Sequence, residues 1–552
     1  MASTEAWVSC LLAYIRPFDD KIGHLRTYND EMPVNPPLSS TSHDVLPEVV
    51  FTPPKDNAAA QRVSRMRQQG LLKQLYRGVY TSNLNAEDAD VVRRNWSRIL
   101  DYLAPGCVLS HRSAFDTKPK DGLIYISRAE GRRDLELPGL TFKGLIKPSL
   151  RPLVHTERPG AADVPYQGFY VSSQPRAYLE NLTADKRMAP RQLPRAEIEE
   201  RLEKLITLRG ARAVNALRDD AREVAVRLGL AAEFKTLDNL IGAMLGTHPA
   251  RVLGSRVALA RAHGLPYDPQ RVELFEQIAS QLRNQEFADV PEPARNSSPR
   301  EMFAFVESYF SNFIEGTTFT LEEAEDIVFH GRIIPNRSED SHDVKGTFDA
   351  ALRDPFYSET PNTAEDLLTW LQRANALIMQ ARKDKHPGEW KVDANQAGST
   401  LFVLPELVPE TLRKAWSMMP LLNQPMQRAL FAMFVVSEIH PFTDGNGRTA
   451  RLLMNAFLSE HGQCRVIIPT VFREDYLLSL KAMSHQGDAT AYIRAMVIGQ
   501  VWASELNYEV EVPEMNRQLD ECNAKKEDTR VFRLLSPKKR RPISAESWPP
   551  KG

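Results

Sequence analysis

The feature that most constrains the fold of this chain is a short loop between two strongly helical stretches. Apolar residues recur at helical spacing in residues 427–439 and again in residues 449–458. Between them, residues 440–451 read HPFTDGNGRTAR, which places an imidazole, a carboxylate, two glycines and two arginines side by side. The pattern predicts two consecutive helices whose connecting loop runs into the start of the second helix.

The composition of this loop predicts a phosphate site. The start of a helix presents unpaired N–H groups and a partial positive charge, so it attracts anions. Gly445 and Gly447 allow positive φ angles and a close approach of the backbone to a ligand. Arg448 and Arg451 are three residues apart, so they share a helical face and can reach the same polyphosphate.

Two further side chains of the loop add chemistry. Asp444 offers the hard oxygen that Mg²⁺ prefers, and His440 is the only group of the loop that accepts a proton near neutral pH. Taken alone, His-Pro-Phe is commonly a helix end and Gly-Asn-Gly is commonly a turn. Their combination at this spacing favours a nucleotide-phosphate site with its own base.

The loop also resembles the signature of the Fic family at every specified position from His440 to Arg451. Fic proteins commonly transfer AMP from ATP to a Ser, Thr or Tyr hydroxyl of a protein. The resemblance therefore implies ATP as substrate, Mg²⁺ held by Asp444, and His440 as the base that deprotonates the target hydroxyl. It further implies that Gly445, Asn446 and Gly447 cradle the α- and β-phosphates, that Arg448 neutralises the leaving diphosphate, and that Arg451 grips the γ-phosphate.

A second motif lies upstream, at the end of an apolar helical stretch. Residues 311–316 read SNFIEG and resemble the inhibitory motif of Fic proteins, with Gly316 as a natural helix stop. Ser311 and Glu315 are four residues apart and share a face. The resemblance implies that Glu315 pairs with Arg451 and blocks the γ-phosphate position. The alternative is an ordinary solvated carboxylate near a helix end. In some relatives the same glutamate positions water to remove AMP, and the sequence does not separate the two directions.

Two weaker features accompany these motifs. Residues 392–405 suit a short β-hairpin, and in the Fic family a hairpin flap at this place aligns the target segment by main-chain pairing; a plain connector is the alternative. Tyr476 lies where an aromatic residue of the family often lines the adenine pocket, although an aromatic at helical spacing is more often part of a core.

The N-terminal half carries a basic segment. Residues 57–80 contain no acid and five cations, with a predicted helix at 58–69 and a hairpin at 71–81. The cations are Arg62, Arg65, Arg67, Lys73 and Arg77. Such a segment suits contact with a DNA backbone through residues 57–81, while a solvated basic helix is the alternative. With residues 108–114 and 122–127, the order of elements resembles AbiEi-type antitoxins, which are winged-helix transcriptional regulators.

The composition of the chain excludes several classes of protein. The net charge of −1 over 552 residues does not suit a general polyelectrolyte binder, and 42% hydrophobic with 26% charged residues is ordinary for a globular protein. No run of 18 apolar residues exists, so no membrane contact is expected, and residues 7–15 lack the basic start of a signal peptide. The four cysteines are scattered, which suits a reducing cytoplasm. They are Cys10, Cys107, Cys464 and Cys522.

We therefore expect a mostly α fold: an all-helical Fic core with a small β-hairpin flap, preceded by an α+β winged-helix-like region and a helical middle segment. The expected domains are an N-terminal arm and linker at 1–56, a winged-helix or AbiEi-like domain at 57–190, a helical segment at 191–288, a linker at 289–300, a Fic domain at 301–510 and a disordered tail at 511–552.

The expected function is that of an autoinhibited protein adenylyltransferase whose partner is a protein with a hydroxyl side chain, including the chain itself. The alternatives are removal of AMP, transfer of another phosphate-bearing group, or a transcriptional regulator or antitoxin that uses the Fic half as a nucleotide sensor. The sequence does not indicate the oligomeric state or the target.

Overall fold

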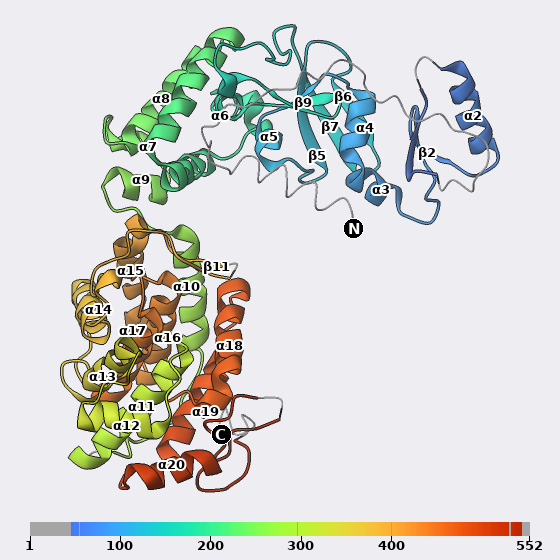
Figure 1. Ribbon diagram of the computed structural model, residues 1–552. Helices are drawn as coiled ribbons and strands as arrows, with labels where there is room; N and C mark the ends of the chain where they lie inside the picture. The colour runs from blue at the N-terminus through green and yellow to red at the C-terminus, as the bar shows by residue number, and fades with distance from the viewer. Residues whose placement is uncertain (1–45, 54–55, 295, 399, 529–530, 544–552) are drawn as a thin grey trace. The chain divides into compact units, whose positions relative to one another are not determined.

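The computed structural model describes residues 46–53, 56–294, 296–398, 400–528 and 531–543 (Figure 1). Nearly all of the predicted N-terminal arm at 1–56, with Cys10 and residues 7–15, lies outside these residues, as does the end of the chain. The chain divides into two compact units after Arg94. Each unit is described by itself.

The first unit is a small three-stranded antiparallel sheet with two helices. Its elements are β1 (Val49–Phe51), α2 (Asn57–Gln68), β2 (Lys73–Tyr76), β3 (Val79–Thr81) and α3 (Asp88–Arg94), and the strand order is β1-β3-β2. The Asp56 carboxylate caps α2 by accepting the Ala59 N–H at 2.9 Å. Gly78, with φ of 78°, makes the tight turn between β2 and β3. The helix and hairpin predicted for this segment are therefore confirmed.

The second unit begins with a six-stranded mixed sheet in the order β6-β7-β5-β4-β9-β8. The strands are β4 (Val108–Leu109), β5 (Leu123–Arg128), β6 (Asp134–Leu137), β7 (Leu140–Ile146), β8 (Val164–Tyr166) and β9 (Phe169–Val171), and the helices among them are α4 (Trp96–Leu103), α5 (Arg112–Asp116) and α6 (Gln174–Glu180). The expected α+β content is present. The predicted domain at 57–190 is nevertheless divided at Arg94, because the hairpin segment forms its own unit.

Three helices follow the sheet: α7 (Arg195–Leu228), α8 (Ala231–Met244) and α9 (Arg256–Ala262). Gly210, with φ of 74°, interrupts the helical backbone of α7. Leu202, Val224 and Leu240 are fully buried in a core that these helices share with α6. The predicted helical middle segment is thus confirmed as far as Ala262.

The rest of the second unit is a helical core with one short hairpin, which confirms the mostly α prediction (Figure 1). Its helices are α10 (Pro269–Arg283), α11 (Ser297–Ile314), α12 (Leu321–His330), α13 (Ser338–Leu352), α14 (Ala364–Ile378), α15 (Val408–Trp416), α16 (Pro425–Ile439), α17 (Asn446–Glu460), α18 (Arg473–Gln486), α19 (Thr490–Glu505) and α20 (Val512–Glu521). The hairpin, hereafter the flap, consists of β10 (Gln396–Ala397) and β11 (Thr400–Leu401). It lies where the sequence predicted it.

The boundary predicted at 289–300 is wrong. Helix α10 belongs to the same core as α16, because the buried Phe275 ring lies edge-on to Phe431 and Phe434 at 6.4 and 6.0 Å. The supposed linker is also attached to this core, since the Cys464 N–H donates to the Val290 carbonyl at 2.7 Å. Glu292 and Ala294 of this segment are buried, and α11 begins at Ser297, so the segment is a packed connection rather than a division between domains.

The prediction of a disordered tail from residue 511 is wrong for residues 512–528 and 531–543. Helix α20 buries Val512, Met515 and Leu519 at helical spacing, and Cys522 continues the buried face. The following segment returns to the core through Leu534.

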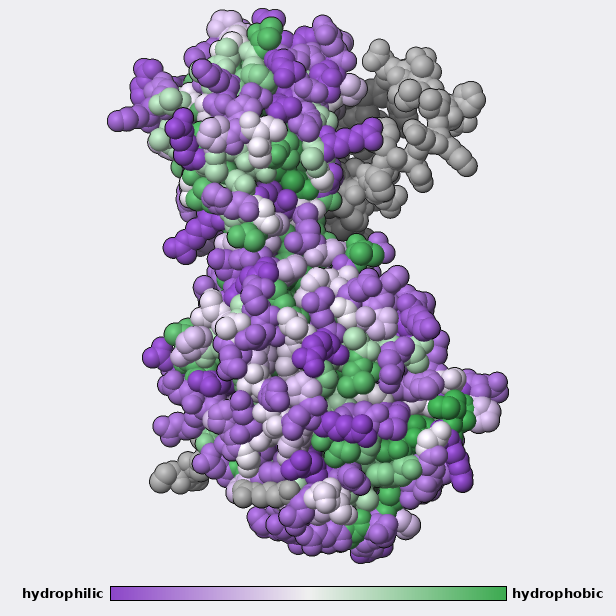
Figure 2. Space-filling model, turned by 90° about the vertical axis from the view of Figure 1, so that its left-hand side faces the viewer, coloured by the Kyte–Doolittle hydropathy of each residue, from purple (hydrophilic) through white to green (hydrophobic). Residues whose placement is uncertain are grey.

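The face in Figure 2 is largely hydrophilic with limited hydrophobic areas. Within the described ranges, no helix combines the length and the apolar character that a membrane span needs.

Candidate active site

The loop at 440–445 joins the two helices of the predicted pair. Helix α16 ends at His440, whose φ of 54° turns the chain, and Gly445, with φ of 77°, precedes α17. Asn446 braces the loop, because its Oδ1 accepts the Phe442 N–H at 2.8 Å and its Nδ2 donates to the Phe442 carbonyl at 2.9 Å. The side chain of Asn446 therefore holds the loop, and the part of Asn446 suited to a phosphate is its backbone N–H at the helix start.

His440 is held in one orientation from two sides. Its ring stacks on Phe402 of the segment after β11, with centroids 3.9 Å apart and planes 7° apart. Its Nδ1 lies 3.2 Å from the Ser437 carbonyl, a contact that favours the proton on Nδ1 and leaves Nε2 as the acceptor. Burial lowers the pKa of His440 to about 4, so the imidazole is neutral at physiological pH and has a free lone pair that can accept a proton.

Lys391 holds the start of the loop through the carbonyls of Ile439 and Pro441, and the sequence did not predict this role. Its Nζ donates to Asn395 Oδ1 at 2.6 Å and to the Ile439 carbonyl at 3.3 Å, while its N–H donates to the Pro441 carbonyl at 3.0 Å. Burial lowers the pKa of Lys391 to about 7. A lysine in a connector carries no signal in the sequence, because its role depends on the packing of the flap against the loop.

Glu315 and Arg451 meet, as the inhibitory motif implied. Arg451 Nη2 lies 2.7 Å from Glu315 Oε1, while its Nε donates to Ser311 Oγ at 3.0 Å and its Nη2 to the Ser311 carbonyl at 2.8 Å. The Arg451 side chain is 6% exposed and that of Glu315 is 35% exposed. Burial alone would raise the pKa of Glu315, but the Arg451 guanidinium outweighs it and leaves that pKa below its ordinary value. The ion pair is therefore complete at neutral pH.

The Glu315 carboxylate also covers the start of α17. A Cβ atom placed on Gly447 would lie 2.2 Å from Glu315 Oε1 and 3.1 Å from Arg451 Nη1. A larger residue here would require the Glu315 carboxylate to shift. The Glu315 carboxylate thus lies at a helix start beside a guanidinium, a combination that attracts anions.

Arg448 is tied to a partner that the sequence did not reveal. Its Nη1 lies 2.7 Å from Asp343 Oδ2 on α13 and donates to Asn312 Oδ1 at 3.3 Å. Asp343 is buried and also pairs with Arg382 Nε at 2.8 Å. Asp343 lies far from the signature in the chain, so its contribution depends on how α13 packs against α17.

Asp444 is the accessible acid of the loop. Its side chain is 42% exposed, with Arg448 Nη2 at 3.7 Å and the Gly445 N–H donating to Oδ1 at 2.6 Å. No group of three or more metal-ligating side chains occurs among the described residues. One exposed carboxylate beside a phosphate cradle fits Mg²⁺, which usually keeps several waters and takes further ligands from phosphate.

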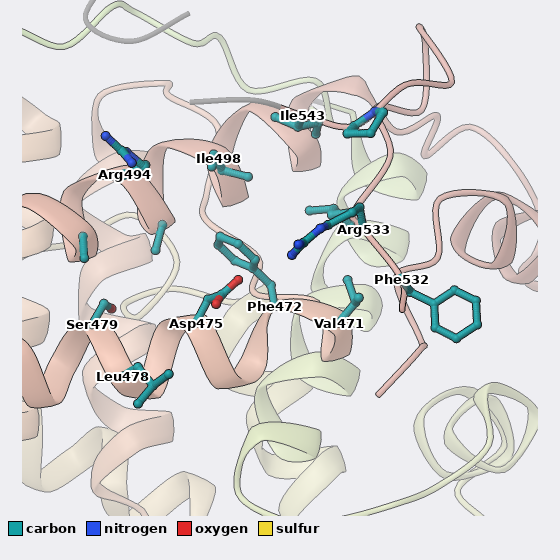
Figure 3. Close-up of a pocket in the computed structure, with 14 residues that line it drawn as sticks. Val471, Phe472, Asp475, Leu478, Ser479, Arg494, Ile498, Phe532, Arg533 and Ile543 are labelled. Atoms are coloured by element: carbon teal, nitrogen blue, oxygen red, sulfur yellow. The ribbon is translucent and has the colours of Figure 1, made fainter. Parts of the chain in front are cut away.

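The placement of Tyr476 argues against the predicted adenine contact. Tyr476 is 2% exposed and its phenol hydrogen-bonds Arg451, so the ring helps to hold the guanidinium. A cavity of about 480 Å³ lies beside α18 and α19 and is lined by Phe472, Asp475 and Arg494 among others (Figure 3). Neither Tyr476 nor a residue of the 440–451 loop lines this cavity.

Helix α11, which carries Ser311 at its end and Glu315 just after it, is also anchored to α17 through Glu307. Glu307 Oε1 accepts from Asn455 Nδ2 at 2.7 Å and Glu307 Oε2 pairs with Arg465 Nη1 at 2.6 Å. Glu307 and Arg465 are 7% and 2% exposed. Glu307, Ser311 and Glu315 follow one another at intervals of four residues, so one face of α11 makes all of these contacts. We call the contacts of Glu307 with Asn455 and Arg465 the Glu307 clasp.

Comparison with known proteins agrees with this geometry. Residues 365–458 match the model of the Fic/DOC family. The protein adenylyltransferase fic-1 of Caenorhabditis briggsae is 33% identical over 228 residues, covering 39% of this chain and 43% of the relative. The protein adenylyltransferase Fic of Nematostella vectensis is 30% identical over 259 residues, covering 44% of this chain and 58% of the relative. The chain thus spans about half the length of these curated relatives.

Among solved structures, Fic-1 of Caenorhabditis elegans (residues 134–508) is similar with 20% identity and a TM-score of 0.32, covering 58% of this chain and 92% of that chain. The family match includes the loop at 440–451, the flap and the first part of α17. Residues 365–458 are therefore the part of this chain that is similar to the Fic/DOC family.

Proposed function

We propose that this chain transfers AMP from ATP to a hydroxyl of a target protein and that Glu315 holds the reaction off. The observation that carries the proposal is the Glu315 carboxylate, which lies on Arg451 and over Gly447 in the cradle that His440 borders. The buried Arg451 and the start of α17 at Gly447 together suit a phosphate, and in this structure the Glu315 carboxylate lies at that position. The named relatives are protein adenylyltransferases, which supports the same reaction.

The proposed reaction uses His440 as the base. The target hydroxyl loses its proton to His440 Nε2 as its oxygen attacks the α-phosphorus of ATP, and the bond between that phosphorus and the bridging oxygen of the β-phosphate breaks. AMP remains on the target, and diphosphate leaves with the electron pair. Arg448, Arg451 and the N–H groups at the start of α17 bind the phosphate charge.

We propose that Asp444 contributes one ligand to Mg²⁺ that arrives with ATP. The bound ion supplies charge neutralisation of the phosphates. The exposed carboxylate of Asp444 beside the cradle supports this assignment.

The direct test of the proposed function uses the full chain with Glu315→Gly, Mg²⁺ and ATP labelled at the α-phosphate. We expect label on a protein, including the chain itself, and an intact mass increased by one AMP. Absence of label from every protein in a lysate and from the chain would reject the proposal. ATP labelled at the γ-phosphate, labelled UTP and a pre-adenylylated target distinguish AMP transfer from transfer of another group and from removal of AMP.

The pH dependence of the proposed reaction follows from the burial of His440. Its pKa of about 4 lies below the ordinary value, so the basic form is present above that pH and is lost as the pH falls through it. We expect kcat/KM for AMP transfer by Glu315→Gly to show no inflection near pH 6.5, the ordinary pKa of histidine. Loss of Glu315 removes a nearby negative charge and lowers the pKa of His440 further. A pH–rate profile with an inflection near 6.5 would contradict this expectation.

We propose DNA binding by the first unit as a second function, and a winged-helix regulator of the AbiEi type as its class. The observation that favours it is the exposure of Arg62, Arg65, Arg67 and Arg77 on α2 and the hairpin turn, where Val63 is the buried residue of α2. Side chains that neutralise phosphates release counterions, so such binding weakens steeply with salt.

We therefore expect the full chain to retard a DNA duplex in a gel shift at low salt. The double variant Arg65→Glu and Arg67→Glu is expected to lower the affinity about 100-fold, because charge reversal replaces two phosphate attractions by repulsions. Arg93→Glu, an exposed arginine on α3 that pairs with Asp90, is the matched control. Equal shifts by the wild type and the double variant would reject DNA binding through α2.

We propose a cytoplasmic location for these activities. Cys107, Cys464 and Cys522 are free thiols buried in separate parts of the structure. Buried unpaired thiols suit a reducing compartment.

A further inference from the structure

One side chain of α10 reaches both the flap and the helix that carries the base. Arg271 Nη2 donates to the Leu401 carbonyl at the end of β11 at 2.8 Å. Arg271 Nε lies 3.0 Å from Glu438 Oε1 on α16. Leu401 directly precedes Phe402, and Glu438 lies two residues before His440. The Arg271 guanidinium therefore links Leu401 and Glu438, which lie next to the stacked rings of Phe402 and His440 in the chain.

The contact of Arg271 with Glu438 is mostly shielded from water, whereas its bond to the Leu401 carbonyl lies at the surface. The side chains of Arg271 and Glu438 are 18% and 4% exposed. Glu438 Oε2 also accepts the Ser484 hydroxyl, so the carboxylate has a fixed direction. A planar guanidinium presents several donors in a rigid fork, so it can serve two acceptors on different elements at once. Lysine, with a single flexible ammonium group, does not reproduce this geometry.

The flap has few other attachments to the body. β11 pairs with β10, and Thr400 Oγ1 lies 3.1 Å from His485 Nε2 in an exposed contact. Exposed side-chain hydrogen bonds contribute little to rigidity because water competes for both partners. Arg271 differs from that contact because a buried carboxylate, Glu438 on the helix of the base, fixes the guanidinium that donates to β11.

We propose that Arg271 is a positioning residue that fixes β11, and with it Phe402, relative to His440. Because α10 lies outside residues 365–458, this residue is not part of the matched family region. The inference rests on the proposed function in one respect: the flap is taken to align the segment that receives AMP. With Arg271 in place, a target segment paired with the flap stands in a fixed relation to His440 Nε2.

The experiment uses the full chain carrying Glu315→Gly, with and without Arg271→Met. We expect backbone amide hydrogen exchange of residues 396–404 to become about tenfold faster in Arg271→Met, because one hydrogen bond to a charged donor is lost. AMP transfer from α-labelled ATP to protein is expected to fall about tenfold by the same loss. The calorimetric Kd for ATP is expected to change less than about twofold, because Arg271 touches no part of the phosphate cradle. Arg413→Met, which breaks the exposed pair with Glu365 in the same domain, is the matched control.

A second pair of variants separates positioning from charge balance. Glu438→Gln removes the buried charge and keeps an acceptor for Arg271, so residues 396–404 are expected to exchange as in the parent. The double variant Arg271→Met and Glu438→Gln is expected to exchange as fast as Arg271→Met alone, since the bond to Leu401 is still missing. If the double variant instead recovers the parent behaviour, Arg271 only neutralises Glu438 and the inference is overturned.

Unchanged exchange at 396–404 in Arg271→Met also overturns the inference, whatever happens to the activity. An equal loss of ATP binding and AMP transfer does so as well, because it indicates general damage to the domain. If the Glu315→Gly parent transfers no AMP to any protein, the proposed function fails, while the exchange measurements still decide the role of Arg271. The two failures are therefore distinguishable.

Discussion

Replacement of Glu315 by glycine is expected to raise the initial rate of AMP transfer by about 10-fold, since a charge-assisted hydrogen bond to a partly exposed carboxylate contributes about 1.5 kcal/mol. The Glu315 carboxylate is 2.7 Å from Arg451 Nη2 and covers Gly447, so ATP must compete with it for the same cations. Glycine removes the carboxylate and leaves Ser311 and Tyr476 to hold the guanidinium. The measurement is the rate of label transfer from α-labelled ATP.

Two variants make the result specific. Glu460→Gly places the same substitution at the end of α17, where the glutamate side chain is 37% exposed and contacts Thr360 and His461, and it is expected to leave the rate unchanged. Glu315→Gln keeps a hydrogen-bond acceptor without the charge and is expected to give an intermediate rate. A Glu315→Gly rate within a factor of about two of wild type would show that the carboxylate is no brake.

His440→Ala in the Glu315→Gly background is expected to lower AMP transfer by about 1,000-fold, within the usual range for a general base. The imidazole is fixed by Phe402 and the Ser437 carbonyl, so Nε2 is the ring nitrogen that remains to accept a proton. ATP affinity is expected to stay within about threefold, because Arg451 and the start of α17 still bind the phosphates. Rates and calorimetric binding of ATP give the two quantities separately.

The control for this variant is His461→Ala. His461 follows the end of α17 with a side chain 39% exposed, and its loss is expected to change neither rate nor ATP affinity. Retention of more than about one tenth of the transfer rate by His440→Ala would exclude a general-base role. Parallel loss of ATP binding would point to collapse of the loop instead.

The chemistry of the site could be predicted largely from the sequence, because it is encoded within short segments. The loop at 440–451 carries its base, its glycines and both arginines in consecutive residues, and the helices on either side are set by local apolar spacing. The pairing of Glu315 with Arg451 joins distant segments, yet the motif around Glu315 implied it. The flap and the basic helix α2 were recognisable for the same reason.

The supporting contacts could not be predicted, since they depend on which helices pack together. Asp343 holds Arg448 from α13, and Lys391 supports the loop from a connector; both look like ordinary surface charges in the sequence. Tyr476 illustrates the converse, because its position suggested a nucleotide contact while the packing of α18 turns its phenol onto Arg451. The domain limits failed at residues 269–300 and 512–543, where proline and polar residues concealed segments whose apolar side chains are buried.

The Glu307 clasp restricts how the contact between Glu315 and Arg451 can open. A shift of α11 as a whole would leave a buried charge without its partner, at a cost of about 3–5 kcal/mol. In the final turn, by contrast, the Glu315 carboxylate is partly exposed, its partner Arg451 is also held by Ser311 and Tyr476, and the turn ends in Gly316 with φ of 95°. If Glu315 holds the reaction off as proposed, we expect its release to be a movement of one carboxylate on the timescale of local loop motion, about nanoseconds to microseconds, rather than a rearrangement of helices. A molecule that binds this single side chain would then be sufficient for activation, and the other contacts of the site would be the same before and after it.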